Sequence, residues 1–414
     1  MLRILHAADL HLGVETYGHI NPETGLNTRL EDCLTALDEA VDYALNNDVS
    51  LFLFCGDAYK SREPSQTHQR EFALRLRRMA AASIPVFLLV GNHDLPAALG
   101  RATTMDIFPA LAVARVTVAR QGGTYLIETR HGPLQIIALP WASRSSLLAQ
   151  EEYKSLPAEE VNRLMEKKLT DFIQQEADSL RDDIPAIMAA HWAFSDAVPG
   201  SERTMTLGRD PVLLPSSVPT RLDYVALGHI HRHQSAGGGL MQPLRVYSGS
   251  LQAMDFGDEG QEKGFCVVDL DERQSAGKRV VDFQFHKVTN RPFVTIRVDV
   301  RGREPTATVL QAIASAGGGV AGAIVRLQIR LSLREEGMLQ ETQVRRALQE
   351  AHHFVIAREI VQEQRTRLGD VLPQELTPLK ALELYLASRQ TDPERAQELM
   401  KYAAELIGGD GAFP

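Results

Sequence analysis

Residues 3–11 read Arg-Ile-Leu-His-Ala-Ala-Asp-Leu-His, a short apolar run that closes on two polar side chains, Asp9 and His11. Such a run is typical of a central strand, because a strand covered on both faces needs no alternation of polar residues. Helical spacing over residues 30–45 then suits a crossover helix. Four further apolar runs end in polar residues: 51–55 before Gly56-Asp57, 86–90 before Gly91-Asn92-His93-Asp94, 186–190 before His191, and 224–227 before Gly228-His229-Ile230-His231. The sequence therefore predicts a layered α/β domain over residues 1–285.

The composition is that of an ordinary globular protein, with 44% hydrophobic and 23% charged residues among 414. At about 150 residues per domain this length predicts two or three domains, and the composition excludes disordered, collagen-like and disulfide-scaffold proteins. The three cysteines, Cys33, Cys55 and Cys266, form no C-x-x-C pair, so we expect neither a disulfide framework nor a zinc knuckle. We expect a cytoplasmic protein without secretion or a membrane span, because neither a signal-like leader nor about 18 consecutive apolar residues occur.

The hydrophobic pattern changes near residue 286, where apolar and polar residues begin to alternate. Such alternation is typical of half-buried strands with one solvated face. The expected elements are strands over 294–300 and 325–331, helices over 305–315 and 339–351, and a glycine loop at 317–319. Together they predict a small α+β domain over residues 290–370.

Two short amphipathic helices are predicted beyond Pro373, over residues 378–389 and 393–407. They make up a C-terminal segment, residues 376–408, that either docks on a partner or folds back on its own domain. The chain holds no G-x-x-x-x-G-K-[ST] motif, so any ATP-driven step must come from another subunit.

The formal net charge of −9 argues against a protein that coats nucleic acid by bulk electrostatics, although it leaves nucleic acid open as a substrate. One stretch, residues 60–78, is locally basic and carries Lys60, Arg62, Arg70, Arg75, Arg77 and Arg78. A solvated helix face and a phosphate-contacting surface explain this stretch equally well.

Metal-binding residue types follow all five strand-like runs, and ligands of α/β sheets lie beyond the carboxyl ends of the strands. In Asp9-x-His11 and His229-x-His231 the side chains are two positions apart, so extended backbone would point both to one side. Any one motif alone is more often a capped turn than a ligand, but the ordered set is hard to explain by chance. The candidate ligands are Asp9, His11, Asp57, Asn92, His191, His229 and His231.

Seven oxygen and nitrogen ligands are too many for one tetrahedral zinc and suit two cations about 3.5–4 Å apart with a bridging carboxylate. The absence of thiolate ligands favours Mn²⁺, with Mg²⁺ or Fe²⁺ as further options. A hydroxide held by two such ions would attack the phosphorus atom in line. The leaving alkoxide then needs a proton, for which His93 is the candidate donor, with Asp94 as the residue that orients it.

This ordered set of motifs is similar to that of the calcineurin-like metallophosphoesterases, and within them the chain resembles the SbcD-type exonucleases, relatives of the meiotic-recombination nuclease. The resemblance is carried by residues 4–13, Gly91-Asn92-His93-Asp94, Gly228-His229-Ile230-His231, Tyr247-Ser248-Gly249-Ser250, Asp255-Phe256-Gly257 and Glu262-Lys263-Gly264-Phe265. It implies a layered two-sheet phosphoesterase domain, a capping domain at residues 290–370 that helps to position DNA, and C-terminal helices. One departure is Ala58-Tyr59-Lys60, where many relatives carry a hydrophobic pair and then histidine or aspartate; it leaves the role of Lys60 open.

The resemblance also implies roles for the candidate residues. One metal would be held by Asp9, His11, Asp57 and His231, the second by Asp57, Asn92, His191 and His229, and His93 would stabilise or protonate the leaving group. The implied activity is Mn²⁺-dependent 3′ to 5′ exonuclease cleavage of double-stranded DNA ends and endonuclease cleavage of single strands or hairpins, in double-strand-break repair and recombination. The implied partners are a second copy of the chain, bound through helices of the nuclease domain, and an SbcC-type coiled-coil ATPase, docked by the C-terminal helices.

Two other hypotheses compete with a DNA nuclease. The same site could serve a different calcineurin-like phosphodiesterase or phosphatase that acts on a small phosphoester, but such an enzyme needs neither the basic stretch nor the extra domain and helices. A non-enzymatic scaffold with an inactive site is the third hypothesis, and the complete ligand set argues against it.

Overall fold

The computed structural model describes residues 1–96, 101–142, 156–200, 211–236, 243–302, 304–361, 377–389 and 391–408. It divides into two compact units. The first comprises Met1–Val298, Thr306–Ile329 and Gln340–Ala357, and the second comprises Asp299–Pro305, Arg330–Leu339 and Arg358–Pro414. Within the described residues, no helix is both long enough and apolar enough to cross a membrane.

The first unit contains two six-stranded sheets, which confirms the layered α/β prediction. The first sheet has the order β12-β11-β1-β2-β3-β4, in which β1 to β4 are parallel and β11 and β12 are antiparallel additions at one edge. Its strands are β1 (Leu2–Ala7), β2 (Leu51–Phe54), β3 (Val86–Leu89), β4 (Val116–Ala119), β11 (Gly264–Leu270) and β12 (Val280–Lys287). The strand predictions for residues 3–8, 51–55 and 86–90 are therefore confirmed.

The second sheet has the order β5-β6-β7-β8-β10-β9, with four parallel central strands and an antiparallel strand at each edge. Its strands are β5 (Gly123–Thr129), β6 (Gly132–Leu139), β7 (Ala186–His191), β8 (Tyr224–Gly228), β9 (Gln234–Ala236) and β10 (Leu244–Tyr247). The predicted central strands at 186–190 and 224–227 are thus neighbours, although β5, β6, β9 and β10 were not predicted.

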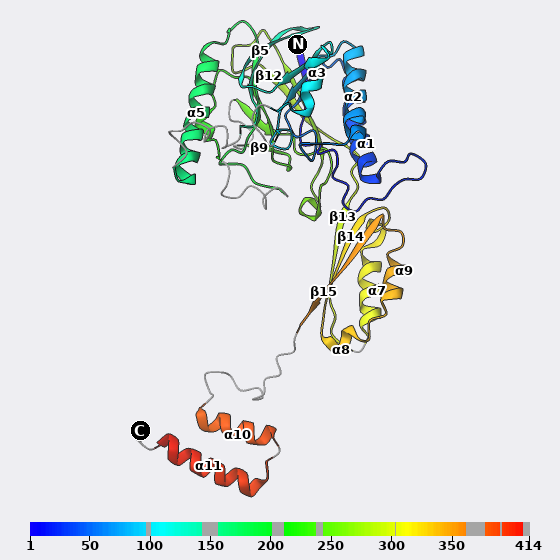
Figure 1. Ribbon diagram of the computed structural model, residues 1–414, viewed down its shortest axis with the longest axis vertical. Helices are drawn as coiled ribbons and strands as arrows, with labels where there is room; N and C mark the ends of the chain where they lie inside the picture. The colour runs from blue at the N-terminus through cyan, green and yellow to red at the C-terminus, as the bar shows by residue number, and fades with distance from the viewer. Residues whose placement is uncertain are drawn as a thin grey trace. The chain divides into compact units, whose positions relative to one another are not determined.

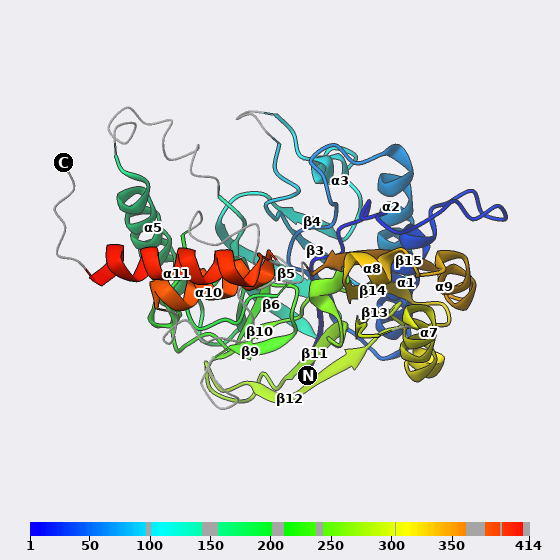
Figure 2. The same cartoon turned by 90° about the horizontal axis from the view of Figure 1, so that it is seen from below.

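Helices cover the outer faces of the paired sheets. Helices α1 (Thr28–Asn46) and α2 (Gln66–Ala81) lie on one side, and α5 (Ala158–Asp178) lies on the other, as Figures 1 and 2 both show. A short helix, α3 (Ile107–Ala110), precedes β4. Asn27 caps α1 by accepting a hydrogen bond from the Arg29 amide at 2.9 Å, which begins the predicted crossover helix two residues earlier than expected.

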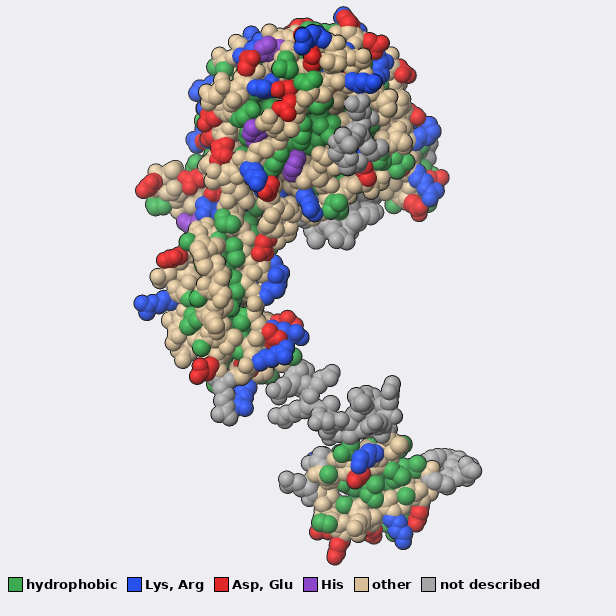
Figure 3. Space-filling model, turned by 180° about the vertical axis from the view of Figure 1, so that it is seen from behind, with side chains coloured by type: hydrophobic (Ala, Val, Ile, Leu, Met, Phe, Trp, Pro, Cys, Tyr) green, Lys and Arg blue, Asp and Glu red, His purple; other side chains and the backbone are tan. Residues whose placement is uncertain are grey.

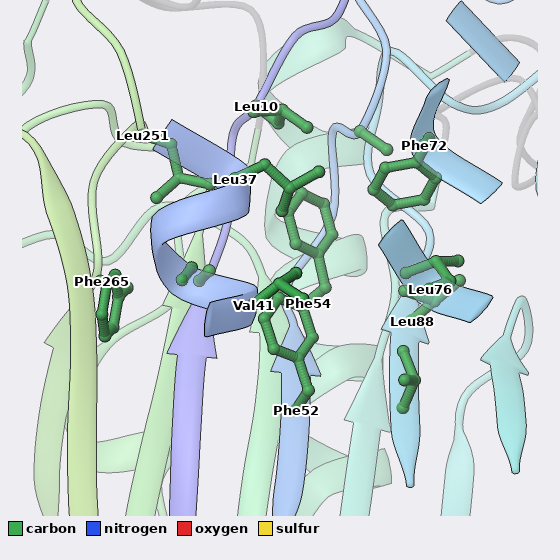
Figure 4. Close-up of a cluster of buried hydrophobic side chains, with 14 of the residues drawn as sticks. Leu10, Leu37, Val41, Phe52, Phe54, Phe72, Leu76, Leu88, Leu251 and Phe265 are labelled. Carbon is green, nitrogen blue, oxygen red and sulfur yellow. The ribbon is translucent and has the colours of Figure 1, made fainter. Parts of the chain in front are cut away.

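Alternate residues of the central strands point into different layers of the core, which explains why their sequences are apolar throughout. In β2, Phe52 and Phe54 pack against α1 and α2 (Figure 4), whereas Leu51 and Leu53 face the second sheet. A third cluster fills the space between the second sheet and α5. The result is four layers, helix, sheet, sheet, helix, with the carboxyl ends of the central strands left free to carry loops.

The smaller sheet has the order β13-β14-β15, with strands β13 (Phe293–Asp299), β14 (Ile324–Leu331) and β15 (His353–Ile360). Its helices are α7 (Pro305–Ser315), α8 (Leu333–Glu336) and α9 (Glu341–Ala347). The two predicted strands and the helix at 305–315 are confirmed, whereas the helix expected over 339–351 is shorter. Gly317–Gly319 forms a 3₁₀ turn rather than the expected loop, because the Gly319 amide donates back to the Ala316 carbonyl.

The C-terminal segment forms two helices, α10 (Pro378–Ser388) and α11 (Pro393–Gly408), at the predicted places. Thr377 caps α10, where its side chain accepts a hydrogen bond from the Lys380 amide at 3.3 Å. The two helices lie side by side in Figures 1 and 2. Tyr402, Leu406 and Ile407 of α11 are exposed.

The buried imidazole of His6 in β1 predicts acid sensitivity of the fold. Its Nδ1 lies 3.0 Å from the Tyr224 hydroxyl, and burial lowers the pKa of His6 from 6.5 to about 3. The folded protein keeps this ring neutral, so the unfolded chain binds one more proton below pH 6.5 and stability falls as the pH drops toward 3. The free energy of unfolding, measured by urea denaturation, should lose up to about 1.4 kcal/mol per pH unit through this group. His6→Gln should flatten that slope; an unchanged slope in this variant would contradict the prediction.

Candidate metal centre

The structure brings the seven candidate ligands together where the carboxyl ends of the two sheets meet. Asp9 and His11 follow β1, Asp57 follows β2, and Asn92 follows β3 in the first sheet. His191 is the last residue of β7, and His229 and His231 follow β8 in the second sheet. The site therefore draws residues from both sheets, and its assembly depends on the way in which the two sheets pack.

Backbone pairing extends beyond the strands and carries the first ligands to one another. The amide of Asp9 donates to the Gly56 carbonyl at 3.0 Å, and the amide of His11 donates to the Asp57 carbonyl at 3.1 Å. The expectation of extended backbone is wrong here, because Asp9 and His11 have φ angles of 52° and 48°, and Asp57 and His229 have 56° and 88°. These left-handed conformations are costly for residues with a side chain, and they concentrate at functional sites.

One group of donor atoms surrounds His11. Its Nε2 atom lies 3.0 Å from Nε2 of His231, 3.7 Å from Oδ2 of Asp57 and 4.0 Å from Oδ1 of Asp9. All four side chains belong to the set predicted for one metal.

A second group of donor atoms surrounds His191. Its Nε2 atom lies 3.0 Å from Oδ1 of Asn92 and 3.4 Å from Oδ2 of Asp57, and Oδ1 of Asn92 lies 3.1 Å from Nδ1 of His229. The same Oδ2 atom of Asp57 therefore lies close to both groups. A carboxylate so placed can bridge two cations.

The donor set fits divalent cations. Adjacent ligands of an octahedral ion with bonds of about 2.1 Å stand about 3 Å apart, and the separations above range from 3.0 to 4.0 Å. Carboxylate, amide and imidazole donors suit Mn²⁺, Fe²⁺ and Mg²⁺ better than soft metals. Three triplets, Asp9-His11-His231, His11-Asp57-His93 and Asp9-Asp57-His191, hold their donor atoms within 4.8 Å of one another.

The electrostatics of the site favour neutral rings at His11 and His229 and a charged pair between His191 and Asp57. Burial lowers the pKa of His11 and of His229 to about 3, even though Asp57 opposes the shift, so both rings offer lone pairs. Burial alone would also lower the pKa of His191, but the Asp57 carboxylate raises it to about 9. Burial alone would raise the pKa of Asp57, whereas His191 and the other histidines hold it well below its usual range. Cation binding at Asp57 therefore competes with a proton on His191.

His93 lies at the rim of the site, with Nε2 4.0 Å from Oδ2 of Asp57 and its ring edge-to-face with His11. Asp94 does not orient this ring as expected, because Nδ1 of His93 lies 2.8 Å from the carbonyl of Lys60. Asp94 instead accepts hydrogen bonds from the amides of Asp57 at 2.8 Å, Gly91 at 3.0 Å and Tyr59 at 3.3 Å. It fixes the backbone of the ligand loops, and burial together with Asp57 raises its pKa to about 7.

Two glycines of the motifs are required by close approaches between the loops. A Cβ atom on Gly91 would lie 2.1 Å from Oδ1 of Asp57, and a Cβ atom on Gly228 would lie 2.0 Å from the carbonyl oxygen of Cys55. No side chain fits at either position without displacing a ligand or its support. These two glycines, which stand next to candidate ligands in the sequence, therefore allow the loops to approach one another closely.

Sequence reasoning missed residues that orient the ligands. Trp141 stacks on the ring of His229 at 5.0 Å between centroids, and its amide donates to the Val90 carbonyl at 3.0 Å. The carbonyl of Cys55 accepts a hydrogen bond from Nδ1 of His191 at 2.7 Å, which turns Nε2 toward the site. Trp141 follows the end of β6, so its position after a strand could have marked it as a site residue. The Cys55 carbonyl could not have been found in this way, because a backbone group leaves no signal in the sequence.

The basic stretch divides into two parts with different surroundings. Arg75 and Arg78 of α2 pair with Asp38 of α1 at 2.6 and 3.0 Å, and Arg70 pairs with its neighbour Glu71. This part is a helix face neutralised by acidic residues. Lys60 and Arg62 form no ion pair with any residue that the structure describes. With Arg101, they line a cavity of about 680 Å³ that is also lined by Asn92 and His93 of the site.

Comparisons with known proteins found a matching family model, sequence relatives and similar solved structures. A family model described as calcineurin-like phosphoesterase matches residues 2–233. The SbcD component of the SbcCD nuclease of Rhodobacter capsulatus is 26% identical over 329 residues, 75% of this chain and 75% of that protein. The DNA double-strand break repair protein Mre11 of Aeropyrum pernix is 25% identical over 257 residues, 59% of this chain and 55% of that protein. Among solved structures, a dimetal phosphatase from Danio rerio aligns with a TM-score of 0.37 at 11% identity, over 70% of this chain and 99% of that chain.

Proposed function

Because this chain belongs to the calcineurin-like phosphoesterase family and is a metal-dependent phosphodiesterase, we propose that its substrate is DNA and its metal is Mn²⁺. The proposed activities are 3′ to 5′ exonuclease cleavage of double-stranded ends and endonuclease cleavage of single-stranded or hairpin DNA, in double-strand-break repair and recombination. The observation that carries the proposal is the placement of Asp57 Oδ2, 3.7 Å from a nitrogen of one donor group and 3.4 Å from a nitrogen of the other.

In the proposed site Asp9, His11, Asp57 and His231 hold one cation, and Asp57, Asn92, His191 and His229 hold the second. When bound, the cations supply a nucleophile from water and neutralise charge on the phosphoryl group. His93 protonates the leaving 3′ oxygen through Nε2, while the Lys60 carbonyl accepts from Nδ1–H and holds the ring. Asp94 keeps the amides of Asp57 and Gly91 in place.

The proposal of a polynucleotide substrate rests on the cavity beside the site. Lys60, Arg62 and Arg101 face it with one acidic neighbour, Glu63, so it suits the phosphates that flank the cleaved bond. The competing small-phosphoester enzyme has no use for cations outside the metal centre. We therefore favour DNA over a small substrate.

The test is degradation of an end-labelled blunt duplex with Mn²⁺, with Mg²⁺ and with chelator, beside a nitrophenyl phosphodiester. We expect Mn²⁺-dependent shortening from the 3′ ends, and loss of all hydrolysis after chelation. Hydrolysis of this nitrophenyl phosphodiester, called the dye ester below, without any attack on DNA would move the assignment to a small-phosphoester enzyme. This outcome requires that DNA is not attacked even with the ATPase partner and ATP present.

The cavity cations give a prediction that separates DNA from the dye ester. The double variant Lys60→Ala/Arg62→Ala should weaken DNA binding and lower the slope of log K against log salt by about 2, since each phosphate contact contributes about 1. The dye ester carries no flanking phosphate, so its hydrolysis should change little. Arg77→Ala, which removes one positive charge outside the cavity, is the control; a change in slope per charge equal to that of the cavity variant would contradict the prediction.

The C-terminal helices are proposed to dock an SbcC-type coiled-coil ATPase. Tyr385, Tyr402, Leu406 and Ile407 are exposed on them, and Figure 3 shows apolar side chains gathered on this helical pair. Such a face is typical of helix docking.

Deletion of residues 376–414 should therefore abolish co-purification with the ATPase and leave the basal, ATP-independent nuclease rate unchanged. Leu406→Ser/Ile407→Ser should weaken binding in the same direction without shortening the chain. Unaltered co-purification of either variant would contradict the docking assignment.

We further propose a homodimer through α2 and α3, where Leu74, Ile107 and the C-cap residue Leu111 are exposed. The proposed domains are the nuclease domain at 1–285, the capping domain at 290–370 and the docking segment at 376–408.

The proposed location is the cytoplasm. The three cysteines are free and buried, which suits a reducing compartment.

A further inference from the structure

The segment from Met254 to Lys263 carries two of the motifs described above, Asp255-Phe256-Gly257 and Glu262-Lys263, and the proposed chemistry gives it no role. We propose that this segment, here called the coupling segment (residues 254–263), transmits the position of the small sheet to the metal ligand His231. Lys263 and Asp258 are then positioning residues of the metal centre. The inference rests on the proposed metal site and goes beyond it, because it assigns a second element that controls that site.

The inner end of the coupling segment holds the backbone of His231. Nζ of Lys263 donates to the His231 carbonyl at 2.9 Å and lies 3.2 Å from Oδ1 of Asp258. Both side chains of this ion pair are 0% exposed. A buried ammonium is costly unless it is fully paired, so Lys263 is confined to the place where the carboxylate and the carbonyl meet. The same carbonyl also accepts from the Ser250 amide at 3.0 Å.

The outer end of the coupling segment is held by the small sheet. The guanidinium of Arg326 in β14 lies over the Phe256 ring at 4.3 Å, and Phe293 of β13 packs edge-to-face on the same ring at 5.0 Å. The carboxylate of Glu259 accepts from the amide and the hydroxyl of Thr295 in β13, at 2.7 and 2.5 Å. All these residues belong to the first compact unit.

Hydrogen bonds within the coupling segment make its two ends move together. The Gly257 amide donates to Oδ1 of Asp255 at 2.7 Å, and the Gln261 amide donates to the Asp258 carbonyl at 3.0 Å. Oδ2 of Asp258 accepts from the Met254 amide at 2.8 Å. Only two residues separate Phe256 from Glu259, and Asp258 lies between them. A shift of the small sheet against Phe256 and Glu259 therefore displaces the carboxylate that fixes Lys263.

The experiment measures Mn²⁺ affinity of the metal-stripped full-length chain by titration calorimetry, beside the thermal midpoint and the kcat and KM for the dye ester. Lys263→Gln should weaken Mn²⁺ binding by about 10- to 100-fold, the range seen when a group that orients a ligand is removed. Phe256→Ala/Glu259→Ala, at the outer end, should weaken Mn²⁺ binding about 3- to 10-fold, because the transmitted restraint is lost. It should also lower the midpoint, because Phe256 is half-buried against Phe293.

Glu262→Ala is the matched control, since Glu262 lies in the same segment but pairs with Lys287 of β12. Its Mn²⁺ affinity should equal that of the unmodified chain. If Lys263→Gln binds Mn²⁺ more weakly but Phe256→Ala/Glu259→Ala binds it normally, the small sheet does not act on His231 and the transmission is overturned. If both variants have a lower thermal midpoint but unchanged Mn²⁺ affinity, the positioning role is overturned. Absence of Mn²⁺ binding in the unmodified chain would overturn the metal centre itself, whereas DNA cleavage that fails with Mn²⁺ affinity intact would overturn the DNA substrate alone.

Discussion

Asp57→Asn is expected to lower kcat/KM for phosphodiester hydrolysis by at least about 1000-fold, which corresponds to about 4 kcal/mol of transition-state stabilisation. The reason is that Oδ2 of Asp57 lies near both donor groups, 3.4 Å from His191 Nε2 and 3.7 Å from His11 Nε2. An asparagine keeps the shape but has no charge, and its amide cannot bridge two cations. Steady-state kinetics on the dye ester and on duplex DNA, with Mn²⁺ titration of the stripped protein, measure the loss.

Glu63→Gln is the control for this substitution, because Glu63 is a carboxylate of the adjoining cavity that belongs to neither donor group. Its activity on the dye ester should stay within about threefold of the unmodified chain, less than about 1 kcal/mol. Circular dichroism should show that Asp57→Asn remains folded. A folded variant that retains a tenth of the original activity would remove the bridging assignment.

His93→Gln is expected to lower DNA cleavage by about 100- to 10,000-fold, the usual contribution of a general acid. The dye ester should lose far less, because a nitrophenolate leaves without a proton whereas the 3′ alkoxide of DNA needs one. Glutamine keeps the backbone amide that donates to Oδ1 of Asp57 at 2.9 Å, so metal binding should be retained. Rates on both substrates at saturating Mn²⁺ measure the difference.

Equal losses on the two substrates would show that His93 acts on the phosphoryl group or on metal binding rather than on the leaving group. The control is His68→Gln, since His68 contacts Glu15 at 3.0 Å and lies outside both donor groups. It should cleave both substrates at rates close to those of the unmodified chain.

Five of the central strands, and the meeting of the loops that follow them, could be predicted from the sequence, because apolar runs that end in polar residues are local signals. Edge strands such as β12 and β15 escaped prediction. Their exposed side chains mix polar and apolar types, so the sequence pattern resembles that of a loop. In the second sheet only β7 and β8 were predicted.

The candidate ligands were also found from the sequence, whereas their backbone conformation was not. Spacing of two residues in Asp9-x-His11 suggested extended backbone, but pairing with the β2 loop imposes positive φ angles. The ion pairs that neutralise part of the basic stretch could not be predicted either. Asp38 and Arg75 are far apart in the sequence and meet only when α1 packs on α2. Asp94 was given the wrong contact for the same reason, since the amides that it binds come from three places in the loops.

The left-handed backbone at Asp9, His11, Asp57 and His229 has a consequence for protein engineering. Each such residue costs of order 1 kcal/mol, so the four together equal a sizeable share of a typical net stability of about 5–15 kcal/mol. Substitutions chosen only to raise the melting temperature would place glycine at these positions first and remove the candidate ligands with them. Any thermostabilised version of this enzyme must therefore hold these four positions fixed and obtain its gains elsewhere in the chain.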